Sequence, residues 1–419
     1  MLEQTEKNYR LGRWMYTLEA AFEYLLSILV AGSFLATLTA ELGMSDSLTG
    51  ILSSVISLGC LFQLLSVPIR PKRQKPFVIV LSIINQVLFL LLYVIPLSGG
   101  SKSVKIGLFI GVIFLAYLTY YIAHPKKINW LMSLVDDHHR GSFTANKEII
   151  SLLAGMAFSF GMGALVDHFA QAGQLRTAFI LSAVVLLVLT LLHTLSMAFT
   201  VEKPLPQAEK KNTLQSMKAL AKNKKIVSVA AVFVLYYIST YCATPFYGTY
   251  LIHEMAFSLK LVTGLSIVGS ISRVAASKFW GRYADRTSFS AMVKRSMLVL
   301  AAGYVCMAFA APSTGVVFYT LYILLHGIAL GGVNSAMINL VFDYAPAEQR
   351  SDALAICQAA AGTAGFLATL AASPLVAYIQ SNGNRLFGLP IYAQQVVSVI
   401  SVLFLVFAYV LIKKEKKDE

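Results

Sequence analysis

The chain has 419 residues, enough for two or three soluble domains of roughly 100–200 residues each. Its composition excludes that organisation: 57% of the residues are hydrophobic and 13% are charged, against roughly 45–50% and about 25% in soluble domains. The formal net charge of +14 would by itself suit a nucleic-acid partner. So few charges in so apolar a chain instead favour an integral membrane protein, with lipid around it and its cations in loops outside the bilayer.

Long apolar segments follow one another along the chain, and each is sufficient to cross roughly 30 Å of hydrocarbon as a helix of about 20 residues. Continuous apolar runs such as 77–97 and 397–412 exclude a β-barrel, whose strands would alternate over about ten residues. The pattern therefore predicts an all-α membrane protein with twelve transmembrane helices. They are expected at residues 14–40, 48–69, 76–97, 106–135, 144–169, 177–200, 226–252, 260–283, 295–312, 315–343, 352–379 and 391–412.

The lysines and arginines are distributed unevenly among the predicted loops. Because the predicted number of helices is even, both termini lie on the same side of the membrane. Most of the 34 lysines and arginines are on that side. The opposite side has only Lys102, Lys105, Arg176, Lys260 and Arg385. By the positive-inside rule, both termini of this multi-pass protein are expected in the cytoplasm, which places it in a plasma (inner) membrane.

A polar segment divides the predicted helices six and six. We expect an N-terminal bundle at 1–200, a cytoplasmic linker at 201–225 and a C-terminal bundle at 226–419. The halves also share short matches at a nearly constant offset: 131–135 (LMSLV) with 337–341 (MINLV), and Arg140 with Arg350. These matches predict a duplicated six-helix unit, and parallel repeats related by an axis along the membrane normal characterise one transporter superfamily.

Two loop motifs carry a resemblance to a known family. Residues 281–286 read G-R-Y-A-D-R, and the segments 136–141 (DDHHRG) and 343–350 (DYAPAEQR) occupy equivalent places in the two halves. On these residues the chain resembles the major facilitator superfamily over essentially its whole length. The resemblance implies two bundles related by a pseudo-two-fold axis, a central cavity and alternating access. It also implies gating roles for Gly281, Asp285, Arg286, Arg140 and Arg350.

The chain departs from the family pattern in two places. Residues 67–73, in the loop after the second predicted helix, lack the glycine and aspartate of the loop motif, so no latch of that kind is expected in the N-terminal half. The predicted helix 144–169 lacks the proline-containing glycine motif that proton-driven drug antiporters of this family tend to carry. This second departure disfavours multidrug efflux.

The first predicted helix carries Glu19 and Glu23, four residues apart and therefore on one face. A charged side chain in mid-membrane costs about 2.5–3.5 kcal/mol on insertion scales. Two carboxylates this close do not both ionise easily, so one is expected to hold a proton near neutral pH, as proton coupling requires. The alternatives are a structural ion pair that neutralises them, or a Glu19 side chain that reaches the cytoplasmic interface.

The fourth predicted helix places two lysines, Lys126 and Lys127, at membrane depth. Adjacent residues of a helix point about 100° apart, so we expect one lysine to face the cavity and the other a neighbouring helix. In the functional hypothesis, a lysine binds the substrate, or pairs with Glu23 until a proton or the substrate arrives. The alternative is a permanent Lys–Glu bridge. The same helix offers further candidate substrate contacts in Tyr120, His124 and Trp130.

Arg273 lies in the middle of the eighth predicted helix, and a guanidinium holds carboxylates or phosphates in a planar fork. Together with Lys126 it is expected to bind an anionic substrate, with pairing to a carboxylate of the protein as the alternative. Aromatic residues suited to sugar rings or organic acids lie in the seventh and tenth predicted helices: Tyr237, Tyr241, Tyr322 and His326.

We therefore predict a secondary active transporter, working as a monomer, that couples the inward movement of a small polar or anionic organic metabolite to protons. Efflux of amphiphilic drugs or lipids is the alternative within transport, and a membrane sensor with a transporter fold is the alternative outside it. The sequence has no P-loop, no C-x-x-C spacing and no Ser/His/Asp arrangement. Enzymatic activity, a bound metal and a cofactor are accordingly not expected.

Overall fold

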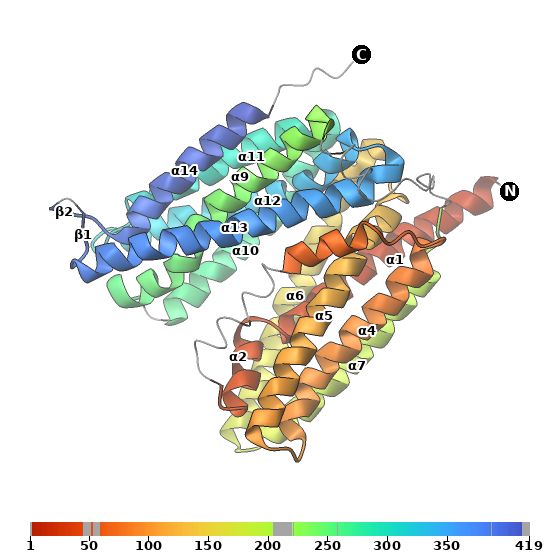
Figure 1. Ribbon diagram of the computed structural model, residues 1–419, viewed down its shortest axis with the longest axis horizontal. Helices are drawn as coiled ribbons and strands as arrows, with labels where there is room; N and C mark the ends of the chain where they lie inside the picture. The colour runs from red at the N-terminus through yellow and green to blue at the C-terminus, as the bar shows by residue number, and fades with distance from the viewer. Residues whose placement is uncertain are drawn as a thin grey trace. The chain divides into compact units, whose positions relative to one another are not determined.

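The computed structural model describes residues 2–44, 52, 59–203, 220, 222–257, 259–386 and 388–412. Figure 1 shows that this part of the chain is almost entirely helical. Helices satisfy every backbone hydrogen bond within the segment, as a chain surrounded by lipid requires. The chain forms two compact units: unit 1 comprises Met1–Asp136 and Lys147–Gln207, and unit 2 comprises Asp137–Asn146 and Ala208–Glu419. Our division at the linker 201–225 remains a prediction, and it did not anticipate that residues 137–146 group with unit 2.

Unit 1 is built from six α-helices and two short 3₁₀ helices among its described residues. In it α1 packs on α7, α7 on α4 and α4 on α5. The elements are α1 (Leu2–Leu29), α2 (Gly32–Glu41), η1 (Cys60–Ser66), α4 (Gln74–Val94), η2 (Ile95–Leu97), α5 (Lys102–Met132), α6 (Arg140–Gln171, which begins in unit 2) and α7 (Leu175–Phe199).

The structure interrupts the first predicted helix, which was expected to run unbroken over 14–40. The chain leaves the helix at Val30 and re-enters it at Gly32, which has a φ of +53°. Glycine adopts this left-handed conformation without steric cost, so the break occurs where a glycine permits it. Residues 48–51 and 53–58 of the second predicted helix, 48–69, lie outside the described residues, and the described end of this segment contains η1.

Unit 2 repeats the packing of unit 1: α9 packs on α14, α14 on α11 and α11 on α12. This agreement between neighbours in the two units supports the duplicated halves predicted from sequence. The elements are η3 (Asp137–His139), α9 (Lys224–Thr249), the π-helical turn η4 (Tyr250–Glu254), α10 (Leu259–Arg286), α11 (Phe289–Ala308), α12 (Gly315–Tyr344), η5 (Ala347–Gln349), α13 (Arg350–Ser381), the hairpin strands β1 (Arg385–Leu386) and β2 (Leu389–Pro390), and α14 (Ala393–Leu411).

Nine helical segments in the described part of the chain are long and apolar enough to cross a membrane. Large apolar side chains such as Leu191 on α7 and Phe407 on α14 are more than half exposed, as expected of side chains that meet lipid. The long helices α1 and α10 are not among the nine. Both carry charged side chains in their middle, and those charges belong to the sites described next.

Candidate functional site

A buried charge network lies inside unit 1. The Lys127 Nζ on α5 donates a hydrogen bond to Glu19 Oε1 at 2.9 Å and a second to the carboxylate of Glu23, both on α1. The Glu19 side chain is 1% exposed and the Lys127 side chain 4%, whereas Glu23 is 24% exposed. Glu23 is therefore the carboxylate of the network that the surroundings can reach.

The spacing of these residues along their helices explains the contact. Glu19 and Glu23 are one turn apart on α1, so their carboxylates project on the same side and Lys127 reaches both. The sequence left open which lysine meets the carboxylates, and the structure gives this position to Lys127. Lys126 is also buried, at 3% exposed, and it is not among the residues that line the adjoining pocket.

The network extends to α7 through His193. Its Nε2 lies 3.1 Å from Glu19 Oε1 and its Nδ1 lies 2.7 Å from Gln86 Nε2 on α4. His193, Gln86 and Glu19 are all nearly inaccessible, with at most 3% of each residue exposed. Four helices (α1, α4, α5 and α7) thus contribute polar groups to one connected cluster.

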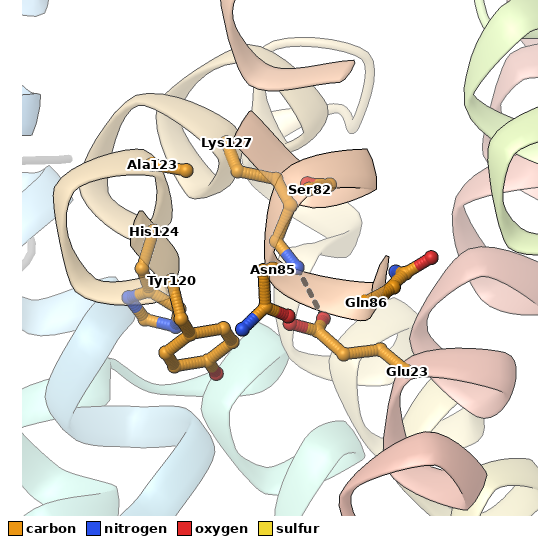
Figure 2. Close-up of a pocket in the computed structure, with 8 residues that line it drawn as sticks. All are labelled: Glu23, Ser82, Asn85, Gln86, Tyr120, Ala123, His124 and Lys127. Carbon is orange, nitrogen blue, oxygen red and sulfur yellow. Dashed lines mark hydrogen bonds and ion pairs between the residues drawn. The ribbon is translucent and has the colours of Figure 1, made fainter. Parts of the chain in front are cut away.

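A small polar pocket opens beside Glu23, and it has room for about one water-sized group. Figure 2 shows Lys127 reaching the Glu23 carboxylate, with Asn85 and Tyr120 close to both. The Lys127 ammonium lies 5.9 Å from the centre of the Tyr120 ring. The pocket is lined by Glu23, Ser82, Asn85, Gln86, Tyr120, Ala123, His124 and Lys127.

The same cluster has the spacing of a cation site. One ligand atom from each of Glu19, Glu23 and His193 lies within 4.8 Å of the others. The Lys127 ammonium, however, is hydrogen-bonded to both carboxylates and supplies positive charge at this point. The Lys127 side chain therefore already neutralises part of the negative charge of these donors. A site that contains this ammonium does not fit a resident metal ion.

The remaining predicted residues of α5 separate into two environments. Tyr120 and His124 line the pocket, and their rings lie 5.5 Å apart. Trp130 is fully buried, and its indole Nε1 donates to the carbonyl of Val201 at 3.0 Å. Its one polar atom is thus engaged in holding the segment after α7 against the end of α5.

Unit 2 contains an aromatic group around Arg273. The rings of Tyr237 and Tyr241 on α9 stack with centroids 5.6 Å apart, and those of Tyr322 and His326 on α12 lie 5.2 Å apart. Arg273 on α10 lies close enough to both Tyr236 and His326 for its charge to act on them. The predicted aromatic residues of unit 2 are thus joined through Tyr236, whose ring lies 5.7 Å from that of Tyr237.

The loop motif at the end of α10 caps the beginning of α6. The Asp285 carboxylate accepts hydrogen bonds from the backbone N–H groups of Gly141 and Ser142, both at 2.9 Å, and from the Ser142 hydroxyl. The first N–H groups of a helix have no partner within the helix, and a carboxylate is favoured there by charge as well. Gly281 permits this contact, because a Cβ there would lie 2.6 Å from the Gly141 carbonyl oxygen.

Further predicted gating residues lie near this contact. Arg140 Nε donates to Asp137 at 3.0 Å, and its Nη1 donates to Asp343 at 3.3 Å. The Arg350 guanidinium lies over the Phe342 ring, 5.5 Å from its centre, which is within the roughly 6 Å of a cation–π contact. Arg286 is exposed at the last residue of α10.

Comparison with known proteins identifies the family. The family model described as Major Facilitator Superfamily matches residues 20–369 and 230–418. The chain belongs to the major facilitator superfamily. Membership shows a multi-pass membrane protein with the two-bundle fold of twelve helices, and a transporter of the secondary kind. A search of curated proteins gave no match.

Solved structures of other superfamily members have the same fold over nearly the whole chain, at 13% to 15% identity. A bacterial homologue of the iron transporter ferroportin, in an outward-facing state with soaked iron, gives a TM-score of 0.72 over 97% of this chain and 98% of that one. The Escherichia coli transporter FucP, in the outward conformation, gives 0.72 over 97% and 99%. The human organic anion transporter MFSD10 (TETRAN) gives 0.68 over the same shares.

Sequence reasoning missed several polar residues of this superfamily member's unit 1 site: Ser82, Asn85, Gln86 and His193. The first three follow one face of α4, at a spacing of three and four residues within an otherwise apolar segment. A polar stripe at helical spacing inside a predicted membrane helix is a signal that could have found them. His193 offered a weaker signal, as the one histidine in a predicted helix without charged residues.

Proposed function

We propose that this protein is a proton-coupled symporter that moves a small polar or anionic organic metabolite by alternating access. The observation that supports it most strongly is the network of Glu19, Glu23 and Lys127, which is buried except at Glu23. In this proposal Glu23 binds the proton and Lys127 exchanges its contacts with the substrate.

The charges of the network favour proton binding. When both carboxylates are ionised, the single ammonium leaves one net negative charge in the membrane interior, which is unfavourable. A proton on Glu23 removes that charge, and Glu23 is the accessible member of the pair. Glu19 is held by both Lys127 and His193, so it is better suited to keep Lys127 in place while Glu23 changes state.

The same proton prepares Lys127 for a substrate. An ammonium has three N–H donors, and two of them point at Glu19 and Glu23. Protonation of Glu23 weakens its hold on the ammonium, so a carboxylate or hydroxyl oxygen of a substrate can accept from it instead. Tyr120 and His124 are placed to contact the rest of such a molecule.

The structural neighbours include a fucose:proton symporter and an organic anion transporter, whose stated substrates fall in this chemical range. Arg273, with its aromatic neighbours in unit 2, is proposed as a second anion contact. A divalent cation is not favoured as substrate, because Lys127 would repel it from the carboxylates. The contact between Asp285 and the start of α6 is proposed as part of the cytoplasmic gate, in a monomer with both termini in the cytoplasm of a plasma (inner) membrane.

The proposal is tested with the purified protein in proteoliposomes under an imposed pH gradient. The solute panel contains neutral sugars, mono- and dicarboxylates, and ferrous iron as the cation arm. We expect at least one organic solute to accumulate when the outside is acidic, and Glu23→Gln to abolish the dependence on the gradient. The matched control is Glu41→Gln, which changes an exposed carboxylate at the end of α2 and should behave as the unaltered protein.

Two results would contradict the proposal. One is that none of the organic solutes accumulates while ferrous iron does. The other is that Glu23→Gln retains the full response to the pH gradient, in which case the proton binds elsewhere.

A further inference from the structure

His193 occupies an unusual position for a titratable side chain. It lies on α7, is 1% exposed, and bridges Gln86 on α4 and Glu19 on α1. Both ring nitrogens are within hydrogen-bonding distance of a partner, at 2.7 Å and 3.1 Å. The identities of the two partner atoms decide where the ring carries its protons.

The observed contacts correspond to a neutral ring. The amide nitrogen of Gln86 can only donate, so Nδ1 of His193 accepts from it and carries no proton. The single ring proton is then on Nε2, which donates to the Glu19 carboxylate. This arrangement fixes one tautomer of the neutral imidazole.

That arrangement leaves an acceptor without a partner. The Gln86 Oε1 is buried, and no group in the described part of the chain donates a hydrogen bond to it. Buried polar atoms are nearly always hydrogen-bonded, so an unpaired oxygen next to a titratable ring calls for an explanation. Figure 2 shows Gln86 on the same side of the pocket as Glu23, with its amide directed away from Lys127 and Tyr120.

A half-turn of the Gln86 amide pairs this oxygen with the ring, moves the amide NH₂ from Nδ1 to the place that the oxygen leaves, and changes the charge of the ring. Oε1 would then face His193 Nδ1, which must carry a proton to donate to it. One proton is taken up, an N–H bond forms at Nδ1, and the existing Nε2–H remains on Glu19. The ring becomes an imidazolium, and its charge offsets the net negative charge that Glu19, Glu23 and Lys127 leave together.

We propose that His193 is a second proton-binding site of unit 1, and that the orientation of the Gln86 amide switches with its protonation. The charged groups around His193 lie on three other helices: Glu19, which it contacts, and Glu23 on α1, Lys127 on α5, which is bonded to both carboxylates, and Lys147 on α6, which acts on Glu19. Proton binding at His193 does not depend on which solute is transported.

The test is a pH titration of the full-length protein labelled with ¹⁵N-histidine, in detergent micelles, with the His193 signals identified by their loss in His193→Gln. At high pH we expect one neutral tautomer with its proton on Nε2, and between pH 9 and pH 5 we expect conversion to the doubly protonated ring. Gln86→Glu presents only acceptor atoms to Nδ1, so the protonated ring should persist to a pH at least one unit higher.

The matched control is Gln63→Glu. Gln63 is a buried glutamine of unit 1 whose Oε1 also lacks a hydrogen-bond partner among the described residues, but it lies on η1, and the ring nitrogens of His193 are bonded to Gln86 and Glu19 instead. The control should leave the His193 titration unchanged. The proposal is overturned if the neutral ring carries its proton on Nδ1, if His193 does not titrate between pH 5 and pH 9, or if Gln63→Glu shifts the titration as much as Gln86→Glu.

The wild-type titration, with the His193 signals assigned from His193→Gln, decides the first two outcomes, so the test survives a Gln86→Glu variant that does not fold. It is also separate from the transport assay. If Glu23→Gln abolishes proton-driven uptake while His193 stays neutral throughout, the proposed function stands and the second proton site is rejected.

Discussion

At the scale of single residues, Lys127 is the side chain on which the unit 1 network depends. Its ammonium is the cation between two carboxylates, one of which is almost completely buried. Removing one partner of a buried ion pair leaves an uncompensated charge, which typically costs about 3–5 kcal/mol.

We therefore expect Lys127→Met to lower the thermal unfolding temperature, and to do so more strongly as the pH rises. At low pH the two carboxylates can take up protons and the cost disappears; at high pH they are ionised and face each other without a cation. Thermal unfolding in detergent between pH 5 and pH 9 measures the difference. Lys102→Met, at the exposed start of α5, is the control. A deficit that does not grow with pH would show that Lys127 contributes packing rather than charge.

Arg273 allows a second prediction at this scale. If its guanidinium holds an anionic group of the substrate in a planar fork, Arg273→Lys keeps the charge but loses the second hydrogen bond. One hydrogen bond to a charged group is worth about 1.5–3 kcal/mol, so we expect substrate affinity to fall at least roughly tenfold. Lys278→Gln, on the same helix and exposed, should leave affinity unchanged. Equal affinities of Arg273→Lys and the unaltered protein would remove Arg273 from the binding site.

At the scale of elements, the contact between α10 and α6 depends on a glycine at each side. Gly281→Ala places a methyl group against the Gly141 carbonyl, and α10 must move away from the start of α6. We expect the Asp285 cap to be lost with it, so that Gly281→Ala and Asp285→Ala lower stability by similar amounts, about 0.5–2 kcal/mol for the cap.

Combining the two changes tests whether they act on one contact. The double variant should be no less stable than the worse of the single variants, because residues that share a contact are not additive. Gly161→Ala, at a position in α6 where a Cβ meets nothing within 4 Å, is the control. Additive losses would show that Gly281 acts on stability independently of the cap.

How far the sequence could predict these elements depended on what kind of signal each one leaves. The long apolar helices were identifiable because hydropathy is a property of each segment alone. The break at Gly32 was not, since it depends on a single backbone angle that an apolar run does not encode. The motif 281–286 was visible as a string of letters, but its hydrogen bonds to Gly141 and Ser142 arise from tertiary packing.

The candidate site shows the same limit. Glu19, Glu23 and the two lysines were selected because charges are rare inside membrane helices. The choice between Lys126 and Lys127 needed the rotation of α5 about its axis, which sequence spacing does not determine. Glutamine has no charge, and the hydrogen bonds of His193 correspond to a neutral ring. Selecting residues by charge therefore did not identify Gln86 and His193.

At the scale of the whole molecule, the uneven distribution of cations predicts the orientation of the chain in its membrane. We expect Asn212→Cys, in the predicted cytoplasmic linker, to be protected in intact cells from a maleimide that cannot cross membranes. Ser101→Cys, in the loop before α5, should be labelled. Both are made in a background without Cys60, Cys242, Cys306 and Cys357. Labelling with the opposite pattern would reverse the predicted topology.

The position of the charges also bears on how the chain is made. α1 is synthesised before α5 and carries Glu19 and Glu23, whereas its cation, Lys127, follows about a hundred residues later. During that interval α1 bears two carboxylates without their partner, at a cost on insertion of about 2.5–3.5 kcal/mol for an ionised acid in the middle of a helix. The ion pairs that compensate Glu19 and Glu23 can therefore form only after α5 has been synthesised.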